Sequence, residues 1–169
     1  MNKHRFGKWI VVSKLDKGGN GTIYNVRDAE EQRAVLKALK SQFRNFENRR
    51  KRFLDEIKIL KKLASYSGVM PLIDASEDDL WYVMPIAEPL NNLLNDSMPL
   101  KDIVGAIRDF ARILAELWET YKISHRDIKP ANLFKLNQRW VIGDFGLVDF
   151  PDSAGVTVEG EKIGPQHYI

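Results

Sequence analysis

The sequence predicts an α+β fold in which a five-stranded antiparallel sheet with one helix precedes a mostly helical part. Three observations lead to this prediction. Short β-rich runs separated by glycine or polar turns fill the first forty residues, a basic amphipathic helix follows, and three prolines then precede a longer amphipathic helix. This order indicates two lobes, of which the chain only begins the second.

Composition excludes several classes of protein before any motif is considered. The chain has 169 residues, 44% hydrophobic and 29% charged, which suits one globular domain with a core. The net charge of +3 is too small to indicate nucleic-acid binding, and the lack of cysteine excludes a disulfide scaffold and a cysteine nucleophile. No stretch approaches the roughly 20 apolar residues of a membrane span and no signal-peptide core follows the start, so we expect a soluble, cytoplasmic protein.

Five strands are expected in the first lobe. Trp9–Val12 is a short apolar run, Thr22–Val26 alternates beyond a glycine cluster, and Arg33–Leu39 follows a polar turn. Two β-rich runs joined by a glycine turn indicate a hairpin with a third strand beside it. Val69–Asp74 and Leu80–Ile86 read as two later strands on either side of an acidic turn.

A change to helical spacing separates these two groups of strands. Phe53, Ile57 and Leu60 form a stripe whose opposite face is filled by arginine and lysine, which predicts an amphipathic helix. Pro85 and Pro99 bound the irregular stretch that best separates the lobes. The predicted units are residues 1–84, a hinge at 85–90, and residues 91–169.

The second lobe begins with a predicted helix of about 20 residues, over 101–121, and continues into a loop-rich stretch with short strands. The expected buried stripe of this helix is Ile103, Ile107, Phe110, Leu114, Leu117 and Tyr121.

Three groups of residues suggest chemistry. Gly18, Gly19 and Gly21 lie between two strands, where backbone N–H groups can approach a phosphate, although taken alone they favour an ordinary hairpin turn. The run 125–132 places three polar side chains just past a buried helix, which is costly without a function. Asp144-Phe145-Gly146 follows twelve residues after that run, and the two motifs at this spacing indicate a functional site.

Together these motifs resemble the eukaryotic-type serine/threonine protein kinases along the length of the chain. A glycine-rich loop, a third-strand lysine, a helix glutamate, a catalytic loop and an Asp-Phe-Gly occur here in the order of that family. The resemblance implies a protein-kinase-like fold that uses ATP and Mg²⁺ and transfers the γ-phosphate to a Ser/Thr hydroxyl of a protein. The alternatives are a pseudokinase-like nucleotide-binding or protein-interaction module without turnover and, less favoured, a small-molecule phosphotransferase.

The resemblance also implies a role for each matching residue. Asp127 matches the proton-accepting aspartate, and Lys129 matches the lysine that steadies the transferring phosphate. Asn132 and Asp144 match the two Mg²⁺ ligands.

The nucleotide side is assigned in the same way. Lys37 matches the lysine on the α- and β-phosphates and Glu56 its helix partner, while Lys40 is a less favoured rival for the lysine role. Met84 takes the gatekeeper position, and the backbone of 85–87 is the hinge expected to hold adenine. The remaining nucleotide contacts implied are Gly18, Gly19, Gly21, Ile23, Val35, Ala87 and Phe134.

Several positions depart from the family or leave a question open. Asp16 stands where the first loop glycine is usual, and Pro165 stands where serine/threonine kinases have threonine, so the acceptor residue type stays open. Ser153 and Thr157 are possible phosphorylation sites for which Arg126 is the usual partner, with plain loop polarity as the alternative.

Protein partners are expected on two grounds. The sequence ends at Ile169, before the Ala-Pro-Glu-like segment, so we expect a truncated kinase, or one whose helix 101–121 needs a partner. An exposed apolar patch on that helix, open to such a partner or to oligomerisation, should follow. The basic stretch 44–62 reads as a solvated helix face, so no nucleic-acid or membrane partner is expected.

Overall fold

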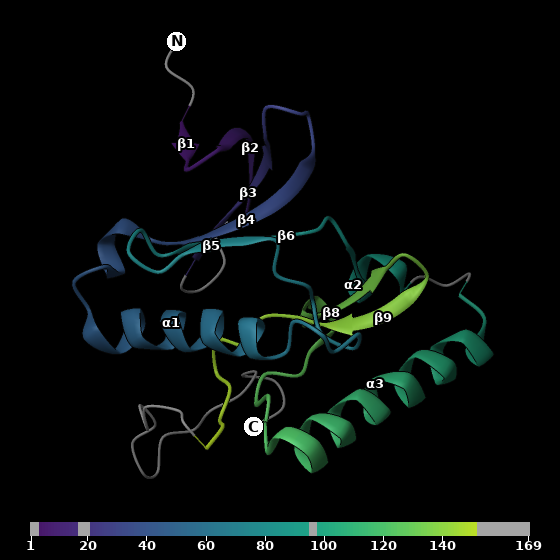
Figure 1. The fold of residues 1–169 in the computed structure, drawn as a ribbon. Helices are drawn as coiled ribbons and strands as arrows, with labels where there is room; N and C mark the ends of the chain where they lie inside the picture. Colours follow the sequence, from purple (N-terminus) through teal and green to yellow (C-terminus); the bar gives the residue numbers. More distant parts are fainter. Residues whose placement is uncertain (1–3, 17–20, 95–97, 152–169) are drawn as a thin grey trace.

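A six-stranded antiparallel sheet forms the first part of the protein (Figure 1). The structure, a computed structural model, describes residues 4–16, 21–94 and 98–151. The strand order is β1-β2-β3-β4-β6-β5. Five strands were expected, and the sixth is the two-residue β1, which extends the sheet beyond β2. The strands are β1 (Arg5–Phe6), β2 (Trp9–Asp16), β3 (Gly21–Arg27), β4 (Arg33–Leu39), β5 (Asp74–Ser76) and β6 (Trp81–Met84).

The prediction of a strand over Val69–Asp74 is wrong, because β5 begins only at Asp74. Val69 instead bridges Ile142 in parallel, and the Met70 N–H donates to the Ile142 carbonyl at 2.9 Å. These apolar residues are buried against a distant strand rather than in the first sheet. A short apolar run does not indicate which strand it will meet, so the sequence misplaced this element.

The two faces of the sheet carry different side chains because alternate residues of a strand point to opposite sides. Leu36 and Val83 belong to a buried cluster on one face that also contains Trp9. The opposite face carries Lys37, whose cross-strand partners are Ile23 on β3 and Tyr82 on β6. The register of β4 and β6 also pairs Val35 with Met84.

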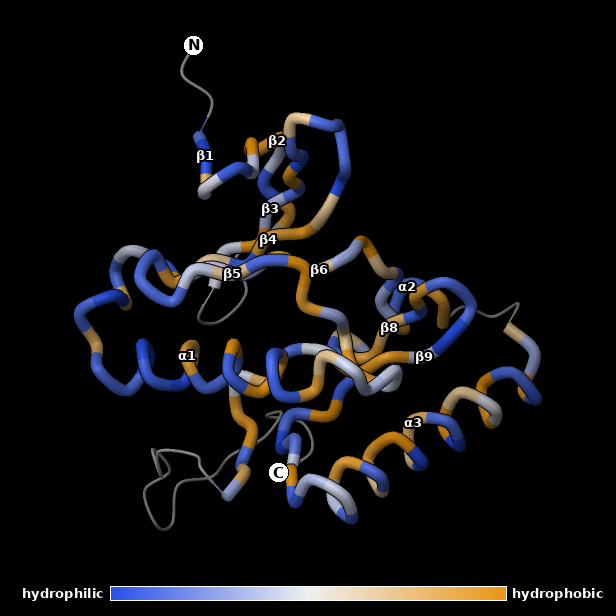
Figure 2. Tube along the Cα trace, viewed as in Figure 1, coloured by the Kyte–Doolittle hydropathy of each residue, from blue (hydrophilic) through white to orange (hydrophobic). Residues whose placement is uncertain are grey.

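Helix α1 (Glu47–Lys62) runs below the sheet (Figure 1). Its buried stripe contains Phe53, Ile57 and Leu60, as the helical spacing predicted. Much of the remainder of the helix is hydrophilic (Figure 2). Glu56 is also buried, with 1% of its surface exposed, and this carboxylate is the charged residue that α1 turns inward.

Beyond β6 the chain passes from the large sheet to a small one. Residues 85–87 lead to β7 (Glu88–Pro89), which pairs with β8 (Leu133–Leu136), and β8 pairs with β9 (Arg139–Ile142). The short helix α2 (Leu90–Leu93) follows β7. The expected hinge lies at this passage, and the division into lobes stays a prediction.

The long helix α3 (Leu100–Tyr121) ends where Lys122 adopts a left-handed conformation, with φ at 56°. Its buried residues are Ala106, Phe110, Ile113 and Leu117. The expectation for Ile107 is wrong, because 61% of that residue is exposed. Apolar residues occur on several sides of this helix, so spacing alone did not select the buried one.

An apolar surface was expected on this helix, and the structure shows one. Leu100, Val104, Ile107 and Trp118 are each more than half exposed. In the described ranges, no helix has the combination of length and apolar character that crossing a bilayer requires.

Candidate active site

Three charged side chains from separate elements meet below the sheet. The Lys37 Nζ on β4 donates to both oxygens of Glu56 on α1, at 2.8 and 3.0 Å. The same Nζ donates to Asp144 Oδ1 at 2.8 Å. Lys40, the rival candidate, has its ammonium 5.8 Å from the centre of the Phe43 ring. The structure therefore brings Lys37, and not Lys40, to the helix glutamate.

Two carboxylates share one ammonium in this cluster, and their pKa values separate accordingly. Burial raises the pKa of Glu56 from 4.5 to about 7, although Lys37 opposes the shift. The Lys37 charge lowers the pKa of Asp144, whose side chain is 42% exposed. Burial alone would lower the pKa of Lys37, but Asp144 and Glu56 outweigh it and raise that pKa above its ordinary value. Asp144 is thus the more readily ionised partner of Lys37.

A second polar group is built around Asp127. Its Oδ2 accepts hydrogen bonds from Lys129 Nζ and from Asn132 Nδ2, both at 2.9 Å. Asn132 Nδ2 also donates to the Asp127 backbone carbonyl at 2.8 Å. The short 3₁₀ helix at Pro130–Asn132 places Asn132 for these contacts. The Asp127 carboxylate is consequently held in one orientation.

His125 and Gly143 join the loop that carries Asp127 to the segment that carries Asp144. His125 Nε2 lies 3.0 Å from the Gly143 carbonyl, and its Nδ1 lies 3.3 Å from the Asp127 amide nitrogen. A neutral ring with its proton on Nε2 satisfies both contacts, and burial lowers the pKa of His125 in agreement. The Gly143 N–H also donates to the Asn132 carbonyl at 2.9 Å.

The donor chemistry of Asn132 and Asp144 fits a magnesium ion. The Asn132 Nδ2 is occupied by Asp127, which leaves its amide oxygen as the atom suited to a metal. Amide and carboxylate oxygens are ligands that Mg²⁺ accepts, and this ion commonly keeps waters and phosphate oxygens as its other ligands. Within the described residues there is no cluster of three or more acidic, histidine or cysteine side chains that could hold a metal. Two protein oxygens would leave the other ligand positions of such an ion to waters or phosphate oxygens.

Two of the expected nucleotide contacts, Gly21 and Ile23, lie beside Lys37. Met84, Ala87 and Phe134 pack against a small core of Met70, Leu136 and Val141. Val35 is paired with Met84, and Ile23 with Lys37. Gly21 lies so close to Lys37 that a Cβ there would be 3.0 Å from the lysine Cγ. Gly18 and Gly19 lie outside the described residues.

Sequence reasoning missed two side chains at this site. Tyr82 donates its hydroxyl to Glu56, and only the register between β4 and β6 would have revealed it. Asp149 forms an ion pair with Arg126, and no sequence signal pointed to that pairing. Ser153, Thr157 and Pro165, named from the sequence, lie outside the described residues.

Comparison with known proteins identifies relatives that match almost the whole chain. The sequence profile described as "Protein kinase domain" matches residues 9–162. The serine/threonine-protein kinases PknD of Chlamydia felis and Chlamydia caviae are 29% and 33% identical, and each alignment covers 96% of this chain. The serine/threonine-protein kinase PknA of Mycobacterium tuberculosis is 27% identical over 96% of this chain.

The chain spans only part of these relatives. It covers 21% of either PknD protein and 40% of PknA. The similarity therefore extends to one region of each relative.

Proposed function

This chain belongs to the protein kinase domain family, and from that premise we propose that it binds Mg·ATP and transfers the γ-phosphate to a serine or threonine of a protein. The observation that supports this most is the contact of Lys37 with both Glu56 and Asp144, at 2.8 Å each. These three residues come from β4, α1 and the segment after β9, and their convergence is what a nucleotide phosphate site requires. The proposed lobes are residues 1–84 and 91–169, with the hinge at 85–90 between them.

Asp127 is the proposed proton acceptor for the attacking hydroxyl. Its Oδ2 is held by Lys129 and Asn132, so the carboxylate keeps one orientation without help from solvent. A proton acceptor must be positioned before it can assist the attack, and this hydrogen bonding supplies that condition. Lys129, whose Nζ donates to Asp127 Oδ2 at 2.9 Å, is the proposed residue that steadies the transferring phosphate.

Lys37 is the proposed contact to the nucleotide phosphates, and Asn132 and Asp144 are the proposed ligands of Mg²⁺. Lys37 stays charged because two carboxylates adjoin it. When bound, Mg²⁺ supplies positive charge that stabilises the phosphoryl group in transfer. The buried His125 bridge between the two loops keeps Asp127 and Asp144 in a fixed relation.

The test is the intact mass of the protein before and after incubation with Mg·ATP and a mixture of Ser/Thr peptides. Wild type should add phosphate to itself or to the peptides, whereas Asp127→Asn should bind ATP and transfer none. Asp78→Asn, the same change at an exposed position in the turn before β6, should match wild type. ATP binding without transfer by wild type would favour the nucleotide-binding module instead, and failure to bind Mg·ATP would overturn both readings.

A further inference from the structure

We infer that Tyr82 is a positioning residue of this site, because its hydroxyl orients the Glu56 carboxylate that holds Lys37. The inference rests on the proposed kinase function. The Tyr82 hydroxyl donates to Glu56 Oε1 at 2.9 Å, and Lys37 Nζ donates to the same oxygen at 2.8 Å. Glu56 Oε1 therefore accepts two hydrogen bonds. One comes from Lys37, the residue proposed to bind phosphate, and the other from the neutral hydroxyl of Tyr82 on a different strand.

The sheet itself places Tyr82 beside Lys37. The two residues are direct cross-strand partners on β4 and β6, so their side chains leave the same face of the sheet. The Lys37 Nζ lies 5.7 Å from the centre of the Tyr82 ring. A shift of register by one residue would turn Tyr82 to the opposite face, so the contact depends on this pairing.

Tyr82 also meets α1 at a second point. Its ring centre lies 5.7 Å from that of Phe53, which stands three residues before Glu56 and on the same side of the helix. The ring thus packs against one turn of α1 while the hydroxyl binds the next. The helix is fixed both in its distance from the sheet and in the direction of its carboxylate.

Burial gives the hydroxyl its effect. Tyr82 is 2% exposed and Glu56 1%, so water does not replace either partner. Lys37 Nζ also donates to Asp144, so only some of the hydrogen bonds of the lysine go to Glu56. The Tyr82 hydroxyl adds a contact that does not depend on Lys37 and that keeps Glu56 Oε1 directed toward the lysine.

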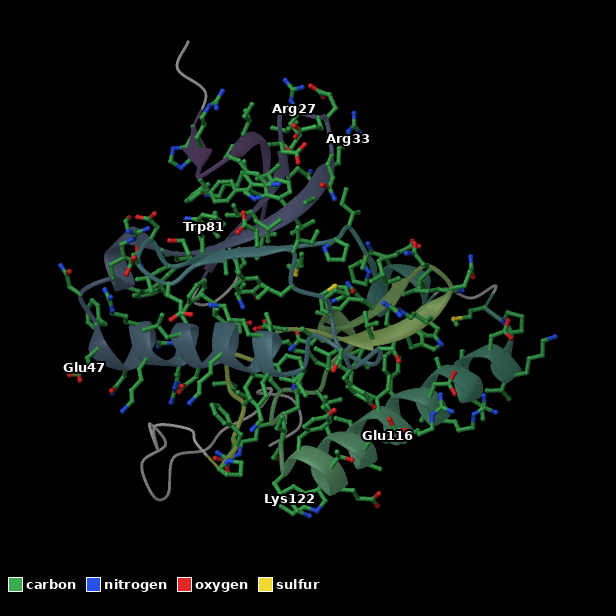
Figure 3. The ribbon with its side chains drawn as sticks, viewed as in Figure 1. Arg27, Arg33, Glu47, Trp81, Glu116 and Lys122 are labelled. Carbon is green, nitrogen blue, oxygen red and sulfur yellow. The ribbon has the colours of Figure 1, made fainter. Side chains whose placement is uncertain are left out.

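The test compares two tyrosine-to-phenylalanine variants. Tyr82→Phe removes the hydroxyl and keeps the ring against Phe53. Tyr66→Phe removes an exposed hydroxyl-to-carboxylate bond to Glu116, which lies on α3 away from the sheet (Figure 3). We expect Tyr82→Phe to lower kcat about tenfold with the KM for ATP within about twofold, and Tyr66→Phe to leave both unchanged.

A background lacking the carboxylate shows whether the hydroxyl acts through Glu56. In Glu56→Ala, Tyr82→Phe should change kcat by less than about twofold, because no carboxylate remains to be oriented. An equal loss in both backgrounds would overturn the inference, as would a Tyr82→Phe variant with wild-type kcat. If Glu56→Ala does not fold, the kcat-against-KM result of the single variant decides alone.

These outcomes separate the inference from the function on which it rests. Wild type that transfers no phosphate overturns the proposed function and the role of Tyr82 together. Wild type that transfers phosphate, with Tyr82→Phe equal to Tyr66→Phe, overturns only the role of Tyr82. Urea unfolding of each variant confirms that the kinetic comparison is made on folded protein.

Discussion

Replacing Lys37 by methionine should destabilise the protein more at pH 8 than at pH 5. The ammonium of Lys37 is the cation that contacts both Glu56 and Asp144. Methionine fills a similar volume without charge, so the main change is that the buried Glu56 carboxylate loses its ion-pair partner. The response to pH then reports on Glu56, because its pKa of about 7 lies between the two conditions.

The sign follows from the protons bound in each state. Folding raises the pKa of Glu56 from 4.5 to about 7, so the folded protein holds more protons than the unfolded chain between these values. The stability associated with Glu56 is therefore fully present below about pH 4.5 and falls as pH rises through 7. Without Lys37 the pKa rises further, and the fall continues beyond pH 7.

The magnitude follows from the same values. At pH 5 Glu56 is protonated in both folded proteins, and its titration adds nothing to the difference between them. At pH 8, one unit above the wild-type pKa, Glu56 is ionised in wild type but protonated in the variant. The variant should therefore lose about 1.4 kcal/mol more at pH 8 than at pH 5, beyond the loss that is common to both.

Urea unfolding followed by tryptophan fluorescence measures the free energy of unfolding of wild type and Lys37→Met at pH 5 and at pH 8. Lys101→Met is the matched control, because Lys101 is an exposed lysine on α3. Its effect should be the same at both pH values. Adding Glu56→Gln to Lys37→Met should remove the pH dependence. An equal cost of Lys37→Met at the two pH values, or a larger cost at pH 5, would refute the reasoning.

Three further predictions concern packing, and all are measured by urea unfolding. Gly105→Ala should stabilise the protein by about 1 kcal/mol, because nothing lies within 4 Å of the added Cβ on α3. Gly68→Ala should destabilise it by about 1–3 kcal/mol, since that Cβ would lie 2.8 Å from Ile113 Cγ1. Equal effects of Gly105→Ala and Gly68→Ala would contradict the structure. Phe145→Ala should cost about 3–5 kcal/mol, because the ring is fully buried and lies 4.7 Å from the His125 ring; a cost below about 1 kcal/mol would argue against this packing.

Local patterns were enough to predict much of this fold. The strand β4 has the bounds that its sequence suggested, and the stripe on α1 is buried as its spacing required. In each case the decisive residues are neighbours in sequence. The same is true of Asp127, Lys129 and Asn132, which lie within six positions and meet through short hydrogen bonds.

What the sequence left undetermined depends on contacts between distant segments. Val69 joins Ile142 across more than seventy positions, and no run of residues around Val69 indicates that partner. Ile107 faces outward because other elements occupy the neighbouring side of α3. Tyr82 reached the site through strand register, which depends on how β4 and β6 align.

One core joins helix α1 beside the large sheet to helix α3 and the segment after β9. Phe53 and Ile57 of α1 belong to the same buried cluster as Phe110 and Leu117 of α3 and Phe145 beyond β9. Pro85 and Pro89, which lie between these elements in the sequence, therefore do not separate two independent hydrophobic interiors. Backbone amides in α1 and α3 should exchange with solvent through one shared opening, so the two helices would lose their protection together.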